Sequence, residues 1–191
     1  TLRRAIDQLV ERGWVQRRQG VGVLVLMRPI DYPLSAQARF SQNLLEQGSH
    51  PTSEKLLSVL RPASSQVADA FAISEGDNVI HLRTLRRVNG VALCLIDHYF
   101  ADLQLWPVLQ TFTHGSLHDL LRNRLDIELT RVRTKISARR AQAKESRILG
   151  IPNMAPLLCV RTLNHRQGEQ SATEYSVSLT RADMIEFTME H

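Results

Sequence analysis

Apolar residues at the start of the chain recur with the period of a helix. An apolar stripe at positions i, i+3, i+4, i+7 and i+8 predicts an amphipathic helix, and it consists of Leu2, Ala5, Ile6, Leu9 and Val10. Thr1 can serve as the N-cap of this helix. Gly13 fits the left-handed position that ends a helix.

A short basic hairpin is predicted directly after this helix. Strand-like runs at 14–18 and 23–26 enclose Gly20 and Gly22. Two glycines at this spacing allow a tight turn whose backbone can approach a phosphate closely. The sequence begins at Thr1 rather than Met, on an incipient helix, so we expect it to be part of a longer chain.

Two prolines separate this strand-like sequence from helix-like sequence. We therefore predict a linker over 29–34, between a truncated domain at 1–28 and a second domain at 35–191. The second domain is expected to open with a helix over 35–47.

The rest of the second domain repeats itself with an offset of 78 residues. Residues identical in both copies are Ile73/Ile151, Arg83/Arg161, Thr84/Thr162, Leu85/Leu163 and Gly90/Gly168. Each copy is predicted to form strand, helix, strand, hairpin and strand, at 54–61, 64–73, 78–87 and 91–99, then at 130–137, 139–149, 156–164 and 172–180, with a helix over 116–123 between the copies. This order predicts an α+β fold with one antiparallel sheet, built from two pseudo-repeated halves, and with helices on one side. The cleft between the halves is the expected ligand site.

Composition places the chain among ordinary globular proteins. Of its 191 residues 43% are hydrophobic and 23% are charged. No run of about 18 apolar residues occurs, so no membrane partner is expected. Cys94 and Cys159 both lie in apolar runs, which favours buried, reduced thiols and a cytoplasmic location.

Basic residues gather in two stretches of the sequence. Residues 1–28 hold six arginines against two acidic residues, which fits a polyanionic partner. Residues 122–147 hold nine basic against three acidic residues. The second stretch is either a further nucleic-acid surface or an exposed strand face on which Arg131, Arg133 and Lys135 alternate, and we favour the exposed strand face.

The segment TLRRAIDQLVERGWVQRRQGVGVLV closely resembles the end of the winged helix-turn-helix in the GntR family of bacterial regulators. The resemblance implies that operator DNA is a partner and that two further helices complete the winged helix. By position it assigns the DNA contacts to the start of the recognition helix and to the wing, namely Thr1, Arg3, Arg4, Arg17, Arg18, Gln19 and Gly20. The alternative is that these arginines form a solvated helix face.

Residues 33–191 are similar to the effector-binding UTRA domain of the HutC subgroup, whose fold is related to chorismate lyase. The alignment rests on four features of the family. These are an arginine pair before the glycine hairpin, residues on the returning strand, a Ser-Leu-Tyr helix start and a late glutamate. The resemblance implies ligand contacts at Thr84, Arg86, Asp97, Tyr99, Ser116, His118, Glu174 and Thr180. Thr84, Ile96 and Thr180 depart from the family pattern, which favours a ligand other than a sugar phosphate.

The chemistry of these positions predicts an effector with an anionic head and a polar tail. Arg86 offers a rigid fork for a phosphate, phosphonate or carboxylate. Ser116 starts a helix, where backbone donors favour an anion, and Glu174 can accept a hydrogen bond from an ammonium or hydroxyl.

The whole sequence looks close to regulators of phosphonate-utilisation operons in enteric bacteria. This resemblance implies a homodimeric repressor with a phosphonate or related phosphorus compound as effector. Since the fold resemblance includes a lyase, a chorismate-lyase-like enzyme is the alternative.

Motifs for other chemistry are weak or absent. His114 and His118 have i, i+4 spacing, but Gly115 and Ser116 place His114 before the helix. The sequence has no HExxH, CxxC, GxSxG or P-loop motif. We therefore predict no metal, no cofactor and no catalytic residue.

Overall fold

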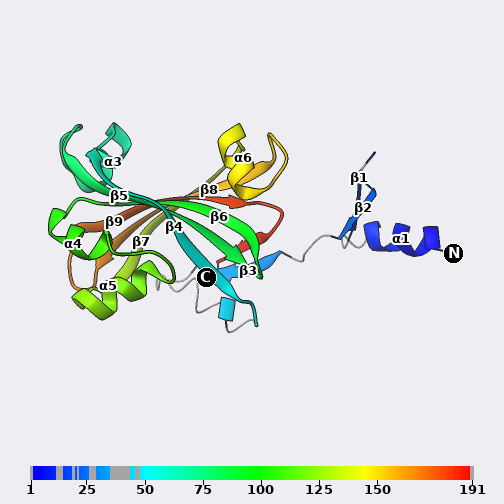
Figure 1. Ribbon diagram of the computed structural model, residues 1–191, viewed down its shortest axis with the longest axis horizontal. Helices are drawn as coiled ribbons and strands as arrows, with labels where there is room; N and C mark the ends of the chain where they lie inside the picture. The colour runs from blue at the N-terminus through cyan, green and yellow to red at the C-terminus, as the bar shows by residue number, and fades with distance from the viewer. Residues whose placement is uncertain are drawn as a thin grey trace.

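A six-stranded antiparallel sheet forms the frame of the second domain (Figure 1). The computed structural model describes residues 2–11, 15–18, 20, 22–25, 29–34, 44–45 and 48–189. The strand order is β4-β5-β6-β9-β8-β7. The strands are β4 (Pro51–Pro62), β5 (Asn78–Val88), β6 (Val91–Phe100), β7 (Leu129–Arg140), β8 (Pro156–Arg166) and β9 (Ala172–Arg181).

The two predicted halves are confirmed as β4-α3-β5-β6 and β7-α6-β8-β9, which meet where β6 pairs with β9. Helix α3 spans Ser65–Phe71 and α6 spans Ala143–Leu149. The second helix starts later than predicted because β7 continues to Arg140. The longer second hairpin raises the offset from 78 residues between β5 and β8 to 80 between β6 and β9, as the registers Arg83↔Asp97 and Arg161↔Val177 show.

Helices cover both faces of the sheet, which corrects the prediction that they lie on one side (Figure 1). Helices α3 and α6 pack on one face, which we call the upper face. The segment between the halves covers part of the opposite, lower face with η1 (Leu103–Leu105), α4 (Trp106–Leu109) and α5 (Leu117–Leu125). Strands β5 and β6 supply apolar side chains to both faces, so each face can bury its own layer.

A second pair of strands packs on the lower face beyond these helices. Strand β3 (Ile30–Pro33) runs parallel to β10 (Ile185–Thr188), and both form a separate two-stranded sheet. Tyr32 and Ile185 are buried there against Leu93 and Ile96 of β6. Residues 30–33 therefore pack as part of the second domain although they were assigned to the linker, and β10 was not predicted. Most of the helix predicted over 35–47 lies outside the described residues.

The N-terminal segment contains the predicted helix and hairpin. Helix α1 (Leu2–Glu11) is followed by β1 (Val15–Arg18), which pairs with β2 (Gly22–Val25). Gly20 and Gly22 have positive φ angles of 77° and 112°, which explains the glycines at this turn. Within the described ranges no helix is long and apolar enough to cross a membrane.

Phe100 anchors the core on the lower face. Its side chain is fully buried between β5 and the α4–α5 segment. We expect Phe100→Ala to lower the free energy of unfolding by about 3–5 kcal/mol in urea titrations, because it leaves a large cavity. Leu103→Ala, at a side chain 42% exposed, is the control and should stay within about 0.5 kcal/mol of the parent. A smaller loss at Phe100 than at Leu103 would contradict this view of the core.

Candidate functional site

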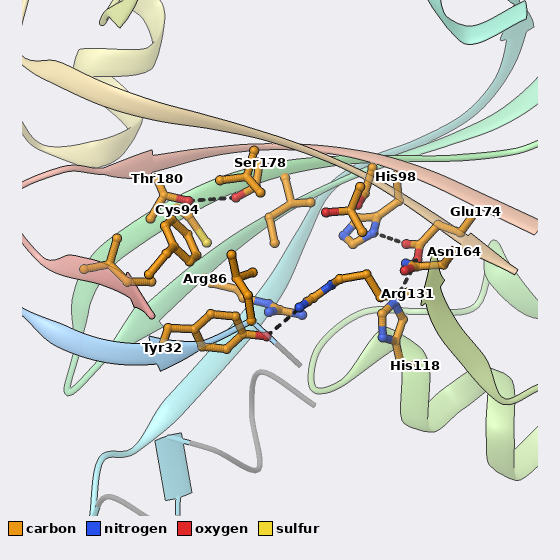
Figure 2. A pocket seen from close by; sticks show the side chains of 17 residues that line it. Tyr32, Arg86, Cys94, His98, His118, Arg131, Asn164, Glu174, Ser178 and Thr180 are labelled. Carbon is orange, nitrogen blue, oxygen red and sulfur yellow. Dashed lines mark hydrogen bonds and ion pairs between the residues drawn. The ribbon is translucent and has the colours of Figure 1, made fainter. Parts of the chain in front are cut away.

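A pocket opens on the lower face between the sheet and the β3/β10 pair (Figure 2). Its empty volume is about 640 Å³, open solvent included. Even-numbered residues of four strands form its sheet wall, because strand side chains alternate between faces. Rows of neighbours cross the sheet, and one row contains Arg86, Cys94 and Thr180, while the next contains Ile96, Ser178 and Val160.

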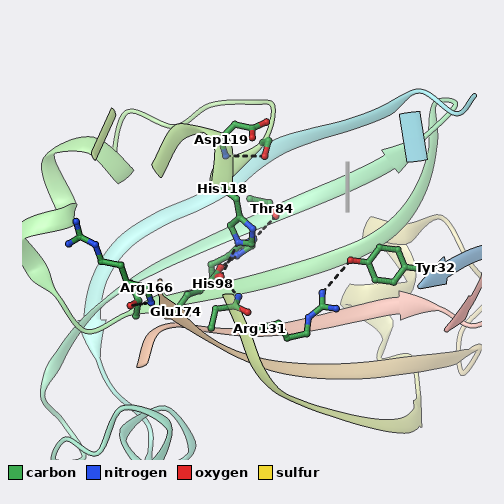
Figure 3. A network of polar contacts seen from close by, with 11 residues as sticks. Tyr32, Thr84, His98, His118, Asp119, Arg131, Arg166 and Glu174 are labelled. Atoms are coloured by element: carbon green, nitrogen blue, oxygen red, sulfur yellow. Dashed lines mark hydrogen bonds and ion pairs between the residues drawn. The ribbon is translucent and has the colours of Figure 1, made fainter. Parts of the chain in front are cut away.

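A buried carboxylate at one end of the pocket receives three hydrogen bonds (Figure 3). Glu174 is fully buried. Its Oε1 lies 2.6 Å from Nδ1 of His98, and its Oε2 lies 2.9 Å from Nε2 of His118 and 2.6 Å from Nδ2 of Asn164. The carboxylate thereby ties β6, β8, β9 and helix α5 together. Its oxygens are occupied by the protein's own donors.

The protonation states follow from burial and from these contacts. Burial raises the pKa of Glu174, but the two histidines outweigh it and hold this pKa well below the usual range, so the group is ionised. Burial lowers the pKa of His98, and the hydrogen bond to Glu174 only partly offsets this effect. A neutral His98 that donates from Nδ1 accepts at Nε2 from the Thr84 hydroxyl, 3.1 Å away.

Thr84, His98 and Glu174 thus form a hydroxyl–imidazole–carboxylate chain. Such a chain activates hydroxyl nucleophiles in hydrolases. Here Thr84 is only 1% exposed and does not line the pocket, so its hydroxyl cannot reach a substrate. The chain orients His98, which lines the pocket.

Two guanidinium groups project into the middle of the pocket (Figure 2). Arg86 comes from β5 and Arg131 from β7. A bulge between Arg131 and Arg133 turns Arg131 to the lower face, whereas Arg133 pairs with Leu163 of the upper face. This corrects the prediction that Arg131, Arg133 and Lys135 share one exposed strand face.

Arg131 also contacts the strand that follows the N-terminal segment. Its Nη2 lies 3.2 Å from the Tyr32 hydroxyl, and its guanidinium carbon lies 5.9 Å from the centre of the Tyr32 ring. Tyr32 in turn packs edge-on against Phe187 of β10, at 5.7 Å between ring centres. The β3/β10 pair is therefore joined to the pocket's cationic side.

The residues predicted to bind the ligand are divided by the structure. Arg86, His118, Glu174 and Thr180 line the pocket. Ser116 does not line it and instead caps α5, where its hydroxyl accepts from the amide of Asp119. Thr84 lies behind His98, as described above.

Asp97 and Tyr99 lie on the upper face, away from this pocket. There Asp97 accepts from Nε and Nη2 of Arg83 at 2.7 and 2.9 Å and contacts Nε2 of His81 at 2.6 Å. These contacts hold the pKa of Asp97 down although burial raises it. Tyr99 stacks on His81, with 4.6 Å between ring centres. The structure therefore separates both residues from Arg86.

The other residues that line the pocket were not among the predicted ligand positions, and those with a ring nitrogen, a guanidinium, an amide or a phenol are Tyr32, His98, Arg131 and Asn164. Of these, only His98 could be predicted from the sequence: it lies two residues after Ile96 and four after Cys94 on β6, so its side chain lies on the same face of the strand as theirs. No local sequence pattern indicates the other three. Tyr32 reaches the pocket because β3 pairs with β10, and Arg131 because of the bulge in β7. Asn164 lies on β8, whose place in the sheet is set by pairing with distant strands.

The predicted DNA contacts lie partly outside the described residues. Thr1 and Gln19 fall outside, and the side chain of Arg18 is not described. Arg3, Arg4 and Gly20 are exposed. Arg17 is exposed and forms an ion pair with Asp7 at 2.6 Å, which links the hairpin to helix α1. The DNA-binding role of these residues stays a prediction.

Among the described residues, no group of three or more His, Cys, Asp or Glu side chains could hold a metal ion. Cys94 and Cys159 are buried free thiols, as predicted, and lie on opposite faces of the sheet. Each packs among apolar side chains of its face.

Comparison with known proteins identifies the family. Residues 46–186 match the model of the UTRA domain. The chain belongs to the UTRA-domain transcription regulators of the GntR type. It is 82% identical over its whole length to the probable transcriptional regulator PhnF of Escherichia coli K12, of which it covers 79%. It is 26% identical to the regulator GgaR of the same organism, with all of this chain and 75% of GgaR covered.

Solved structures agree with the UTRA fold. A crystal structure of a PhnF C-terminal domain is 79% identical, with a TM-score of 0.70 over 83% of this chain and 99% of that one. PhnF from Mycobacterium smegmatis is 25% identical, with a TM-score of 0.78 over 99% of this chain and 83% of that one. The relatives with names are transcription regulators and not enzymes, so the lyase alternative is set aside.

The UTRA domain's stability should fall in acid because of Glu174 and His98. Both groups have a lower pKa in the folded protein than in an unfolded chain, so the unfolded state binds more protons as the pH falls. The contribution of His98 is complete above about pH 7 and is lost below it, and that of Glu174 is complete above about pH 5 and is lost below it. Urea titrations between pH 8 and 3 measure this decline.

Glu174→Gln tests the same network at pH 7. The amide places an NH₂ donor where three donors converge, so we expect a loss of about 2–4 kcal/mol and a flatter acid dependence. Glu75→Gln, at an exposed glutamate, is the control. An unchanged stability of Glu174→Gln would show that the carboxylate does not hold the four elements together.

Proposed function

We propose that this regulator is a repressor whose operator affinity is controlled by a compact dianionic effector, a phosphonate or a related phosphorus compound. The observation that carries the proposal is the convergence of Arg86 and Arg131 in the pocket. Two guanidinium forks in a partly enclosed site favour an anion that offers oxygens to both. A phosphonate head carries up to two charges on three oxygens and matches that requirement.

The remaining pocket surface limits the size and chemistry of the effector. Hydroxyls of Ser176, Ser178 and Thr180 lie along β9 and can bind a polar tail. Ile185 and Phe187 of β10 add apolar contacts on the facing side. Within this proposal His118 binds the ligand, and Glu174 positions His118 rather than contacting the ligand. His98 lines the pocket with its ring, because both of its nitrogens are engaged by Glu174 and Thr84.

A route to the DNA-binding segment starts at Tyr32. An effector that draws Arg131 toward its head group competes with the Tyr32 hydroxyl for the same guanidinium. Strand β3 holds to the domain through four residue pairs with β10 and through side-chain packing, so its shift would leave the pairing of the six-stranded sheet intact. Because β3 follows the N-terminal segment directly, its shift alters how the winged helix is presented.

The quaternary and cellular settings of the proposal follow from its function. A homodimer presents two winged helices to an operator with two half-sites. Operator DNA is reached by the complete winged helix, with Arg3, Arg4, Arg17 and Arg18 as the first contacts to test. A regulator of bacterial operons acts in the cytoplasm.

The effector is tested by thermal unfolding against phosphonates, sugar phosphates, inorganic phosphate, urocanate and chorismate. A ligand at about 100 times its dissociation constant should stabilise the protein by about 2.7 kcal/mol, which raises the midpoint by roughly 5–10 °C. We expect this shift with phosphonates, its loss in Arg86→Ala and in Arg131→Ala, and its retention in Arg124→Ala, an exposed control. A shift that survives both pocket substitutions would place the effector elsewhere.

The coupling route is tested with Tyr32→Phe in a protein carrying the complete winged helix. The variant keeps the ring packing and loses the hydroxyl contact to Arg131. We expect effector binding to persist, while the effector's influence on operator affinity changes by about 1 kcal/mol, or roughly fivefold. Fluorescence anisotropy of labelled operator with and without effector measures this, and Tyr99→Phe on the upper face is the control. Unchanged coupling in Tyr32→Phe would exclude the hydroxyl from the route.

A further inference from the structure

The upper face carries a groove that the effector pocket does not use. Two hollows lie on this face, with empty volumes of about 580 and 780 Å³, open solvent included. Gln66 of α3 and Arg161 of β8 line both hollows, so the two are adjacent, and together we call them the groove. Both α3 and α6, the matching helices of the two halves, supply lining residues, and both stand on this face of the sheet (Figure 1).

Matching positions of the two halves differ in charge inside this groove. In the first half Arg83 faces Asp97 across the strand pair, and the two form a bidentate ion pair. In the second half the matching arginine is Arg161, and the residue opposite it is Val177. The duplicated arginine has therefore kept its place while the carboxylate that neutralises it is absent.

Further positive charge surrounds Arg161. Lys135 of β7 lies directly opposite it on the other side, and Arg133 lies two residues along the same strand. Like charges directly opposite each other on neighbouring strands are destabilising. Within the described part of the chain no carboxylate lies within 4.0 Å of the charged groups of Arg133, Lys135 or Arg161, and the one acidic residue of this hollow is the exposed Asp69. The contact of Arg161 is a neutral one, from Nη1 to the Ser137 hydroxyl at 3.2 Å.

A neutral donor completes the same hollow. The hydroxyl oxygen of Tyr175 accepts a hydrogen bond from Nε2 of Gln66 at 2.7 Å, which leaves its proton to be donated to another acceptor. Tyr175 lines the hollow together with Arg133, Lys135 and Arg161. Three cations and one hydroxyl donor in one hollow are groups that bind oxyanions.

We propose that a small oxyanion with at least two negative charges binds on the upper face at Arg133, Lys135, Arg161 and Tyr175, where it replaces the carboxylate that the second half lacks. This site is separate from the effector pocket, since the sheet lies between them. The domain would then bind anions at two independent sites, one on each face of the sheet.

The positive charges on the edge strand β7 have an alternative explanation, which predicts a different result in the mutants. Lysine and arginine on an edge strand discourage pairing between sheets of neighbouring molecules. That role needs the charges of β7 alone, whereas the proposed site also needs Arg161 on the inner strand β8. Substitution of Arg161 therefore separates the two roles.

The test is calorimetric titration of pyrophosphate and inorganic phosphate into the Arg86→Ala protein, whose effector pocket is disabled. We expect one remaining anion site, weakened roughly tenfold or more by Arg161→Gln and by Lys135→Gln. Arg147→Gln removes the same charge from an exposed position of α6 outside the groove and should leave the affinity unchanged. Thermal midpoints identify any variant that fails to fold, and Lys135→Gln at an exposed site guards against that outcome.

Installing the missing carboxylate provides the opposite test. Val177→Asp should close the site by neutralising Arg161, while Val177→Asn, of equal size and without charge, should retain anion binding. Absence of any anion binding in Arg86→Ala would overturn the proposal, as would equal affinities in Arg161→Gln and Arg147→Gln. Binding of a non-operator duplex without binding of small anions would also overturn it, in favour of a nucleic-acid surface.

Discussion

Pairing of β6 with β9 joins two copies of one motif into a single sheet, and the rest of the domain depends on this seam. Once the two central strands are in register, the two-residue period of a strand decides which side chains share a face. Cys94, Ile96 and His98 then line up with Thr180, Ser178 and Ser176 below the sheet, while Leu95 and Asp97 meet Leu179 and Val177 above it. A shift of one residue at this seam would exchange the chemistry of the two faces.

The two walls of the pocket are held in place by different interactions. On one side the buried, ionised Glu174 holds three strands and α5 through three hydrogen bonds, and removing either histidine would leave a buried charge poorly compensated. On the other side β3 and β10 touch the sheet through side chains, because they form a sheet of their own. Under the proposed function, a bound effector would act on the β3/β10 wall, because that wall has no backbone pairing with the six-stranded sheet and β3 follows the N-terminal segment in the chain.

Much of the fold could be predicted because local patterns are strong in the repeated motif. Glycine at both hairpins, alternating apolar strands and Ser116 before α5 give element types and approximate bounds. The faces were harder to assign. Counted from the turn at Asn89–Gly90, Arg86 would pair with Leu93, which would put Asp97 on the face of Arg86. A bulge after Arg86 makes it pair with Cys94 and sends Asp97 to the other side.

The bulge in β7 likewise moves a charged side chain from one face of the sheet to the other. Without it Arg131 would join Arg133 and Lys135 on the upper face, and the pocket would have one guanidinium. The partners of Glu174 likewise come from β6, β8 and α5, so no spacing in the sequence indicates them. The local sequence pattern therefore predicts which polar residues belong to each strand, but the bulges determine on which face of the sheet their side chains lie.

Duplication explains why a second anion site is physically reasonable in this domain. The two copies share an arginine at the same position, Arg83 in β5 and Arg161 in β8, and each lines the groove and needs a negative charge nearby. Asp97 meets that requirement within the first copy, so its arginine is locked into the structure and is not available to a ligand. In the second copy Val177 carries no charge and cannot neutralise Arg161, and Lys135 adds a second positive charge beside it. A charge left without an internal counterion in a lined hollow is more weakly held, more exposed to salt and better suited to an exchangeable anion than its matched counterpart.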